Sequence, residues 1–267
     1  MTEYKTLTQI PMGSLKKFIE ENFENIYFSE KAETFFQNEF LGDIANLEDL
    51  ISLKSGSPEE VSKWLADNYG LKLDAKGDYV IASVLFFALN FVKKATAEII
   101  EGVDNKFKGG LHKKCVGFQN DDDKYLIELN VEDKRFNVFV SEHSFDNNIF
   151  NDINLFETYF KPKKDVNLTL PLVNFEEKMD LTDTFKGSSM VKKDDKEYYE
   201  ITDAKSITLL NLGLDKVEVK QASVMSLTRG ISFTLDMVIN DDFFIYIVYN
   251  NKLAFASKML KEDFLKA

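Results

Sequence analysis

Two apolar segments near the C-terminus, Phe243–Tyr249 (FFIYIVY) and Lys252–Met259 (KLAFASKM), are separated only by Asn250 and Asn251. Asparagine tolerates positive φ, and a two-residue link of this kind joins antiparallel strands in a tight turn. Apolar and aromatic side chains dominate both segments. The sequence therefore predicts a buried C-terminal β-hairpin, and the elements that precede it decide which fold it completes.

Upstream of this hairpin, from residue 111 onward, short apolar segments alternate with polar turns, which is typical of successive antiparallel strands. The expected turns are NDDDK (120–124) and DKR (133–135), and a short helix is expected over 149–160, ended by Pro162. The strand candidates are CVGFQ, YLIELNVE, FNVFVSE, VNLTLPLVNF, SITLLNLGLDKVEV and ISFTLDMVI.

The first third of the chain has helical periodicity instead. Apolar residues recur at helical spacing over 15–23 and again over 35–44. Ser57 and Glu60 have the spacing of a capping box, with proline at the first helical position between them. We therefore expect a third helix that begins after Ser57 and ends near Gly70.

The run VIASVLFFALNFV (80–92) is apolar without period-two alternation, which is typical of a strand buried on both faces. We expect this strand at the centre of the largest sheet, with the third helix packed over it through Trp64. Helices first and strands afterwards, without an internal repeat or an obvious linker, predict an α+β fold. A single domain spanning 1–267 is expected from the length.

The charge balance is acidic: 33 Lys and Arg residues stand against 45 Asp and Glu residues, a formal net charge of −12. Sequence-independent nucleic-acid binding needs basic stripes that neutralise phosphates, so no nucleic-acid partner is expected. The longest apolar run is too short to span a bilayer, so no membrane association is expected. The first residues lack a signal-peptide pattern, which predicts a cytoplasmic protein. A protein or small-molecule partner fits this composition better.

Patterns that would carry catalysis or bind a metal are weak. Cys115 with His143 and Asp146 can be drawn as a thiol nucleophile with its base and orienting group, but no helix-opening glycine-rich context surrounds the cysteine. The acidic run 121–123 lacks the spacing of a calcium loop and is expected in a solvated turn. We expect no enzyme activity, no metal and no cofactor, and keep a Cys115/His143 enzyme as an alternative.

Taken in order, seven segments between about residue 25 and residue 260 resemble segments of the serpins, the serine protease inhibitor superfamily. No single segment is decisive, but their order follows that of the family. The segments are NIYFSEK (25–31), SPEEVSKWLADNYG (57–70), ASVLFF (82–87), the strand pair 125–140, VNLTLPLVNF (166–175), VEV (217–219) and DDFFIYIVYNNKLAFASKM (241–259).

The resemblance implies a serpin-like α+β domain. A helical N-terminal third would pack on a large, mostly antiparallel sheet, and a second sheet would end in the C-terminal hairpin. The family's first helices have no counterpart before residue 25, so the chain resembles a divergent, N-terminally shortened serpin in which 1–24 is an atypical helical lead-in. Shortened intracellular serpins occur among poxvirus-like viruses, which implies a monomeric viral protein for host–virus interaction.

The resemblance also implies a reactive loop near 221–235. In an inhibitory serpin a protease cleaves an exposed loop, which then inserts as a new strand into the main sheet. Bulky hinge residues and a short loop would slow insertion. The hinge candidates are Gln221, Ala222, Ser223, Val224 and Met225, and the reactive-loop candidates are Ser226, Leu227, Thr228, Arg229, Gly230 and Ile231.

Arg229 is the candidate cleavage residue, because a trypsin-like pocket pairs a guanidinium group with a carboxylate. The alternative is a surface residue in a strand connection. Three functions stay open: a serpin-like protein that engages a protease or another protein through this loop without stable trapping, a true inhibitor of serine or cysteine proteases, and an unrelated α+β protein-interaction module with an acidic surface.

Overall fold

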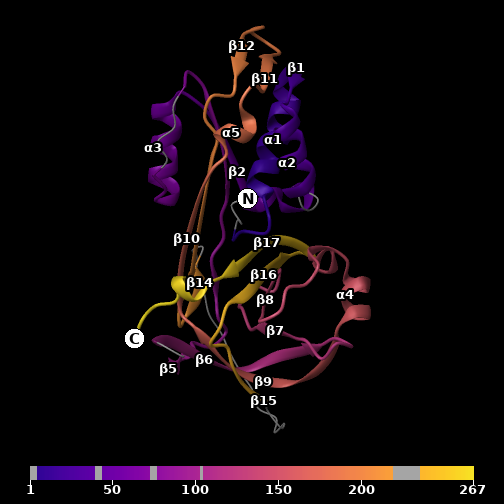
Figure 1. The fold of residues 1–267 in the computed structure, drawn as a ribbon, viewed down its shortest axis with the longest axis vertical. Coiled ribbons are helices and arrows are strands. Elements are labelled where there is room, and N and C mark those ends of the chain that lie inside the picture. Colours follow the sequence, from indigo (N-terminus) through magenta and orange to yellow (C-terminus); the bar gives the residue numbers. More distant parts are fainter. Residues whose placement is uncertain (1–4, 40–43, 73–76, 103–104, 219–234) are drawn as a thin grey trace. The chain divides into compact units, whose positions relative to one another are not determined.

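The computed structural model describes residues 5–39, 44–72, 77–102, 105–218 and 235–267 (Figure 1). The chain divides into two compact units, each assembled from separate stretches of sequence. The sheet unit comprises 1–7, 87–177 and 208–267, and the helix unit comprises 8–86 and 178–207. The single domain expected over 1–267 stays a prediction.

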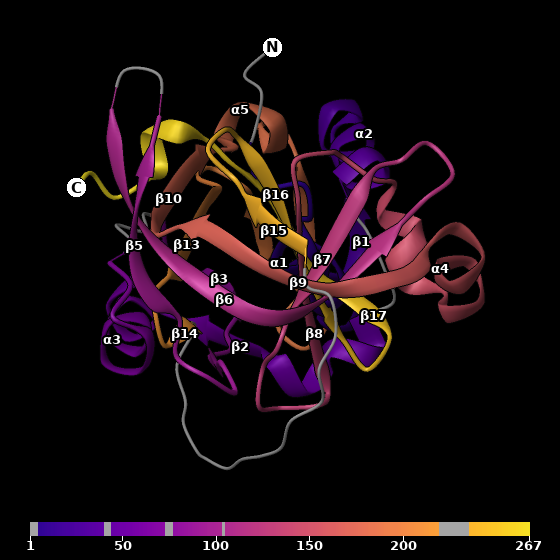
Figure 2. The same ribbon diagram turned by 90° about the horizontal axis from the view of Figure 1, so that it is seen from below.

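An eight-stranded sheet forms most of the sheet unit. Its strands follow the order β15, β9, β6, β7, β8, β16, β17, and β5 pairs with β6 (Figure 2). All of these pairs are antiparallel except β15 with β9. The strands are β5 (Thr96–Glu101), β6 (Lys106–Gln119), β7 (Tyr125–Leu129), β8 (Phe136–Ser141), β9 (Lys161–Pro171), β15 (Leu235–Val238), β16 (Phe243–Tyr249) and β17 (Lys252–Met259).

The predicted C-terminal hairpin is confirmed. Strands β16 and β17 pair through a turn at Asn250 and Asn251, whose φ angles are 46° and 62°. Every residue of β16 except Phe244 is buried. The hydroxyl of buried Tyr246 accepts a hydrogen bond of 2.9 Å from the amide of Phe145, so the polar end of this ring is satisfied inside the core.

A four-stranded sheet follows the order β10, β13, β14, β4. Strands β10 and β13 each begin in one unit and end in the other. The bounds are β4 (Leu89–Asn90), β10 (Val173–Asp180), β13 (Lys205–Leu212) and β14 (Lys216–Glu218), and the remaining elements of the sheet unit are η2 (Asn147–Asn151), α4 (Ile153–Tyr159) and η3 (Lys261–Asp263).

The helix unit holds the predicted helical third of the chain. Within the described residues, no helix is both long enough and apolar enough to cross a membrane. The elements of this unit are α1 (Ile10–Asn22), β1 (Phe23–Tyr27), α2 (Glu30–Glu39), η1 (Ile44–Leu50), β2 (Ile51–Gly56), α3 (Pro58–Tyr69), β3 (Val80–Leu85), α5 (Thr182–Phe185), β11 (Ser189–Lys192) and β12 (Tyr198–Glu200).

Helix α3 begins and ends where the sequence predicts. The Ser57 hydroxyl accepts a 3.3 Å hydrogen bond from the amide of Glu60, and the Glu60 carboxylate accepts one of 3.1 Å from the amide of Ser57. Gly70 ends the helix with φ at 68°. The helix packs on β3 through buried Val61 and Leu65, whereas Trp64 lies at the border of this cluster and is only partly buried.

The expectation that the run 80–92 lies at the centre of the largest sheet was wrong. The run does form strands, but β3 belongs to a two-stranded sheet with β2, and β4 is the last strand of the four-stranded sheet. Ile81 and Leu85 are half-buried and Phe87 is buried. Burial along β3 alternates, with Ala82 and Val84 buried between half-buried neighbours. The apolar run therefore did not report burial on both faces, and the identity of the pairing strand depended on distant parts of the chain.

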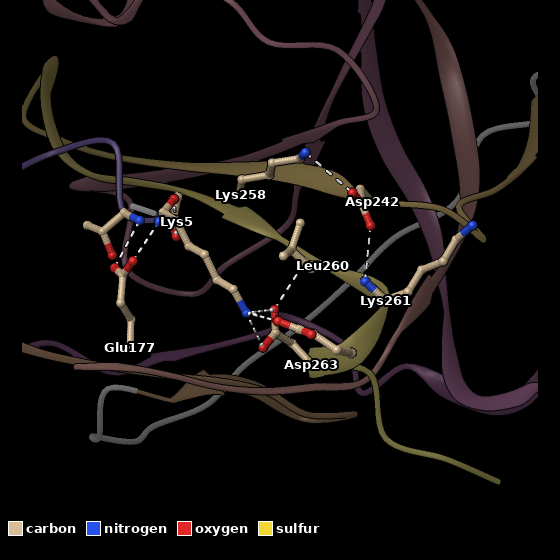
Figure 3. A network of polar contacts seen from close by, with 10 residues as sticks. Lys5, Glu177, Asp242, Lys258, Leu260, Lys261 and Asp263 are labelled. Carbon is tan, nitrogen blue, oxygen red and sulfur yellow. Dashed lines mark hydrogen bonds and ion pairs between the residues drawn. The ribbon is translucent and has the colours of Figure 1, made fainter. Parts of the chain in front are cut away.

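The N-terminal segment of the sheet unit lies along the outer edge of β17. The amide of Leu7 donates to the carbonyl of Ala256 and the amide of Lys258 donates to the carbonyl of Lys5, both at 2.8 Å. The Glu177 carboxylate accepts from the amides of Lys5 and Thr6, and the Lys5 ammonium pairs with Glu262 at 2.6 Å and Asp263 at 3.2 Å (Figure 3). These contacts cover part of a sheet edge that would otherwise present unpaired backbone groups.

Candidate functional site

All hinge and reactive-loop candidates of the sequence lie in 219–234, outside the described residues. They are Gln221, Ala222, Ser223, Val224, Met225, Ser226, Leu227, Thr228, Arg229, Gly230 and Ile231. The structure describes the two places where this segment leaves and rejoins the sheet unit. The segment leaves after β14 and rejoins before β15.

The segment leaves from a hairpin that the sequence did not predict. A single strand was expected over 206–219, but β13 ends at Leu212 and β14 returns antiparallel to it, with Leu212 opposite Val217. The turn is closed by a 2.9 Å hydrogen bond from the amide of Gly213 to the carbonyl of Lys216. Glycine and aspartate at 213 and 215 are turn residues, and this was the available signal.

Strand β14 lies between two other strands. It pairs with β13 on one side and with β4 on the other, where Val217 faces Leu89. Val217 is fully buried, and Leu89 and Leu212 are 2% and 1% exposed. The chain therefore enters 219–234 from a strand that is already inserted in a sheet.

The hairpin turn is fixed to the preceding connection by backbone hydrogen bonds. The amide of Phe91 donates to the carbonyl of Asp215 at 3.0 Å, and the amide of Ala95 donates to the carbonyl of Leu214 at 2.6 Å. Strand β6 approaches this turn closely at Gly110, where a Cβ atom would lie 3.1 Å from the Leu214 side chain and 3.0 Å from that of Ala95. Glycine at 110 thus permits the turn to dock.

A buried histidine lies beside the docked turn. His112 is 6% exposed, and its ring meets that of Phe91 edge-on at 4.6 Å between centroids. Burial lowers the pKa of His112 to about 4, so the imidazole is neutral at physiological pH. The turn that precedes the segment is therefore packed against a neutral imidazole and the ring of Phe91.

The segment rejoins the sheet unit at the end strand of the larger sheet. Strand β15 runs parallel to β9, with Asp236 facing Asn167. The Asn167 side chain donates to the Asp236 carboxylate at 2.8 Å and accepts from the amide of Lys114 at 3.3 Å, which joins three strands. Leu235 is 37% exposed and Val238 is 56% exposed, so β15 leaves apolar surface accessible.

The edges of β3 and β4 differ. Strand β4 carries β14 on its edge, whereas β3 pairs with β2 and, among the strands that the structure describes, with no other. A strand edge of six residues is thus left without a described partner. Unpaired backbone groups of this kind can accept an added strand.

The residues of the enzyme alternative lack the environment of a nucleophile. Cys115 is 1% exposed, and burial together with the nearby Glu128 carboxylate raises the pKa of its thiol to about 12. His143 is exposed. Within the described residues, no group of three or more histidine, cysteine, aspartate or glutamate side chains could hold a metal ion. The acidic run 121–123 lies in the predicted turn between β6 and β7.

Comparisons with solved structures find serpins at low sequence identity. Serpin48 from the insect Tenebrio molitor matches with a TM-score of 0.53 and 11% identity, over 92% of this chain and 78% of that one. Native protease nexin-1 with heparin matches at 0.55 and 10%, over 90% and 75%. Thyroxine-binding globulin in complex with thyroxine matches at 0.52 and 11%, over 89% and 72%.

No protein-family model and no curated protein matches the sequence. The structural matches extend over 89–92% of this chain. The chain therefore has a serpin-like α+β fold.

Proposed function

We propose that this chain engages a protease or another protein through 219–234, and that the segment is cleaved or bound without stable trapping. The observation that carries the proposal is β14, a strand inserted between β13 and β4 directly before this segment. In a serpin-like fold, such a strand would be lengthened if the segment that follows it inserted into the sheet. We further propose that the protein is monomeric and cytoplasmic and that it acts in a virus–host interaction.

The pairing register supports this reading of the segment. Lys216 faces Asn90 and Val217 faces Leu89. Gln221, the first hinge candidate, follows Glu218 at the end of β14 by three positions. The hinge candidates of the sequence thus coincide with the residues that would extend β14.

The composition of the hinge favours slow insertion. Val224, Met225 and Leu227 would each have to enter a packed sheet, and overpacking typically costs about 1–3 kcal/mol. A protease bound as a covalent intermediate would be released before such an insertion was complete. We therefore expect the protease to release the cleaved chain faster than insertion can trap it.

An arginine-selective serine protease of trypsin-like specificity tests the proposal. The chain has only two arginines, Arg135 and Arg229, so the cut is unambiguous by intact mass. We expect cleavage after Arg229, a nicked product and little denaturant-resistant complex. Arg229→Ala should abolish the cut, while Arg135→Ala, which removes an exposed side chain paired with Asp133 at 2.7 Å, should leave it unchanged.

Two results would contradict this proposal in different ways. A stable covalent complex on a denaturing gel would identify a true inhibitor. Resistance of the whole segment to arginine-, lysine- and leucine-directed proteases would favour an unrelated protein-interaction module. Thermal melting after nicking separates a binder from an inserting serpin, because completed insertion would raise the melting temperature.

A further inference from the structure

Three short strands, β1, β11 and β12, form a small sheet within the helix unit (Figure 1). Strand β11 lies in the middle and pairs antiparallel with both neighbours. Phe23 and Met190 on one face are 3% and 5% exposed, and the Tyr199 ring meets that of Phe23 edge-on, with 6.1 Å between centroids. Buried side chains on this face therefore hold the sheet in place.

The opposite face of the sheet, which we call the tyrosine face, has no buried residue. The pairing register places its side chains in two rows that cross the strands: Glu24, Val191 and Tyr198 in one row, and Tyr27, Ser189 and Glu200 in the other. Tyr27 and Tyr198 are 61% and 68% exposed, the largest fractions among the large apolar side chains that the structure describes. Aromatic side chains left exposed together on one face are typical of interaction surfaces.

The charged groups on the tyrosine face are both carboxylates, those of Glu24 and Glu200. Neither carboxylate forms a hydrogen bond or an ion pair with a residue that the structure describes. Lys192 lies on the opposite face, where it pairs with Asp195, and the turn 193–196 carries two lysines and two aspartates. The negative charge of the tyrosine face is therefore not compensated within the sheet.

We propose that the tyrosine face binds an extended, arginine-rich segment of a partner protein. A guanidinium group stacks on an aromatic ring and pairs with a carboxylate through two parallel hydrogen bonds, and a lysine ammonium lacks this planar geometry. Each outer strand offers one group of each kind: Glu24 and Tyr27 on β1, and Tyr198 and Glu200 on β12. The face therefore has two places where an arginine can both stack and form an ion pair.

The spacing of the strands fits a segment with closely spaced arginines. Neighbouring strands lie about 4.8 Å apart, so the two outer strands of this sheet are about 10 Å apart. Alternate side chains of an extended segment are separated by about 7 Å, and the long arginine side chains can span the difference. The tyrosine face does not include 219–234, so this interaction and the proposed function can fail separately.

Three fluorescein-labelled peptides test the chemistry of the partner. The first alternates arginine with serine, and in the other two every arginine is replaced by lysine or by citrulline, which has nearly the shape of arginine without its charge. Fluorescence anisotropy with the full chain in about 0.15 M salt restricts the comparison to local charges, because the Debye length is then about 8 Å. The arginine peptide should bind about fivefold more tightly than the lysine peptide and at least about tenfold more tightly than the citrulline peptide. No binding of the arginine peptide, or equal binding of the arginine and citrulline peptides, would overturn the proposal.

Paired glutamate variants locate the site. Glu24→Gln with Glu200→Gln should weaken binding of the arginine peptide about tenfold, since two exposed ion pairs are lost. Glu98→Gln with Glu157→Gln changes the net charge by the same amount at exposed positions of β5 and α4, and should alter the affinity by less than about twofold. Equal losses in the two pairs would mean that the overall charge of the chain attracts the peptide, and would contradict the assignment.

Paired tyrosine variants test the stacking contribution. Tyr27→Ser with Tyr198→Ser should remove the preference for arginine over lysine, whereas Tyr27→Phe with Tyr198→Phe keeps both rings and should keep the preference. Both side chains are exposed, so circular dichroism melting curves should stay close to that of the parent protein. A preference for arginine that survives in the serine variant would show that the rings do not bind the guanidinium groups, and would overturn the proposal.

Discussion

The protonation of His112 links pH to the packing around the turn at Leu214. Burial lowers the pKa of the imidazole from 6.5 to about 4, so the folded protein excludes a proton that the unfolded chain takes up. The contribution of neutral His112 to the free energy of unfolding is therefore complete above pH 6.5 and is lost as the pH falls from 6.5 to about 4. A shift of this size corresponds to about 3 kcal/mol.

We expect His112→Gln to weaken the acid sensitivity of the fold. The measurement is urea unfolding at about pH 7 and about pH 4.5, and the compared quantity is the loss of unfolding free energy between the two pH values for each protein. His143→Gln removes the other histidine, which is exposed, and serves as the control. If His112→Gln lost as much stability on acidification as the parent protein, the buried imidazole would not be the source.

Single residues were predictable where the backbone itself imposes a requirement. Asn250 and Asn251 have the positive φ that their turn needs, and Ser57 caps α3 as its spacing predicts. Gly110 and His112 gave no such signal. Gly110 lies against Leu214, about a hundred positions away along the chain, and His112 lies against Phe91. Such contacts are set by tertiary packing.

At the level of elements, hydrogen bonds between Ser57 and Glu60 stabilise the N-terminus of α3. We expect Ser57→Ala to cost about 1 kcal/mol, because the amide of Glu60 loses its acceptor at the helix N-terminus. Ser57→Asp restores an acceptor and should stay close to the parent value. Chemical denaturation monitored by circular dichroism measures both. Equal losses in the two variants would show that packing of α3, and not its cap, is affected.

Elements were harder to predict where short strands pair with segments that the local sequence does not identify. The hairpin of β13 and β14 was expected as one strand, because apolar residues flank Gly213 on both sides and β14 has only three residues. The apolar run 80–92 was expected in the largest sheet, but β3 pairs with β2 alone among the described strands. In both cases local sequence gave the extended conformation, and pairing between distant segments decided the sheet.

Across the whole molecule, the order of elements carried more information than any motif. Seven weak segments in serpin order pointed to the fold that the structural matches share, although their identity to this chain is only 10–12%. Order survives such divergence because the topology of a sheet constrains which segments must be apolar and where turns must lie. The partner of 219–234 does not follow from topology, because its recognition depends on side chains outside that constraint.

On the proposed function, the size of the hinge residues decides the fate of the whole molecule after cleavage. If bulky hinge residues delay the insertion that would extend β14, reducing their size should speed it. We expect the triple variant Val224→Ala, Met225→Ala, Leu227→Ala to keep Arg229 as the cleavage residue but to convert a larger share of cut molecules into a stable protease complex. Overpacking of about 1–3 kcal/mol for each bulky side chain supplies the physical reason.

The matched control for this variant is Ser223→Ala with Ser226→Ala, which changes polarity in the same segment without removing bulk. The ratio of covalent complex to nicked product, read from a denaturing gel over time, should rise several-fold in the triple variant and stay constant in the control. A rise in both would point to hinge polarity. Unchanged ratios with continued cleavage after Arg229 would mean that the length of 219–234, and not the size of its hinge residues, prevents the protease from being carried far enough to be trapped.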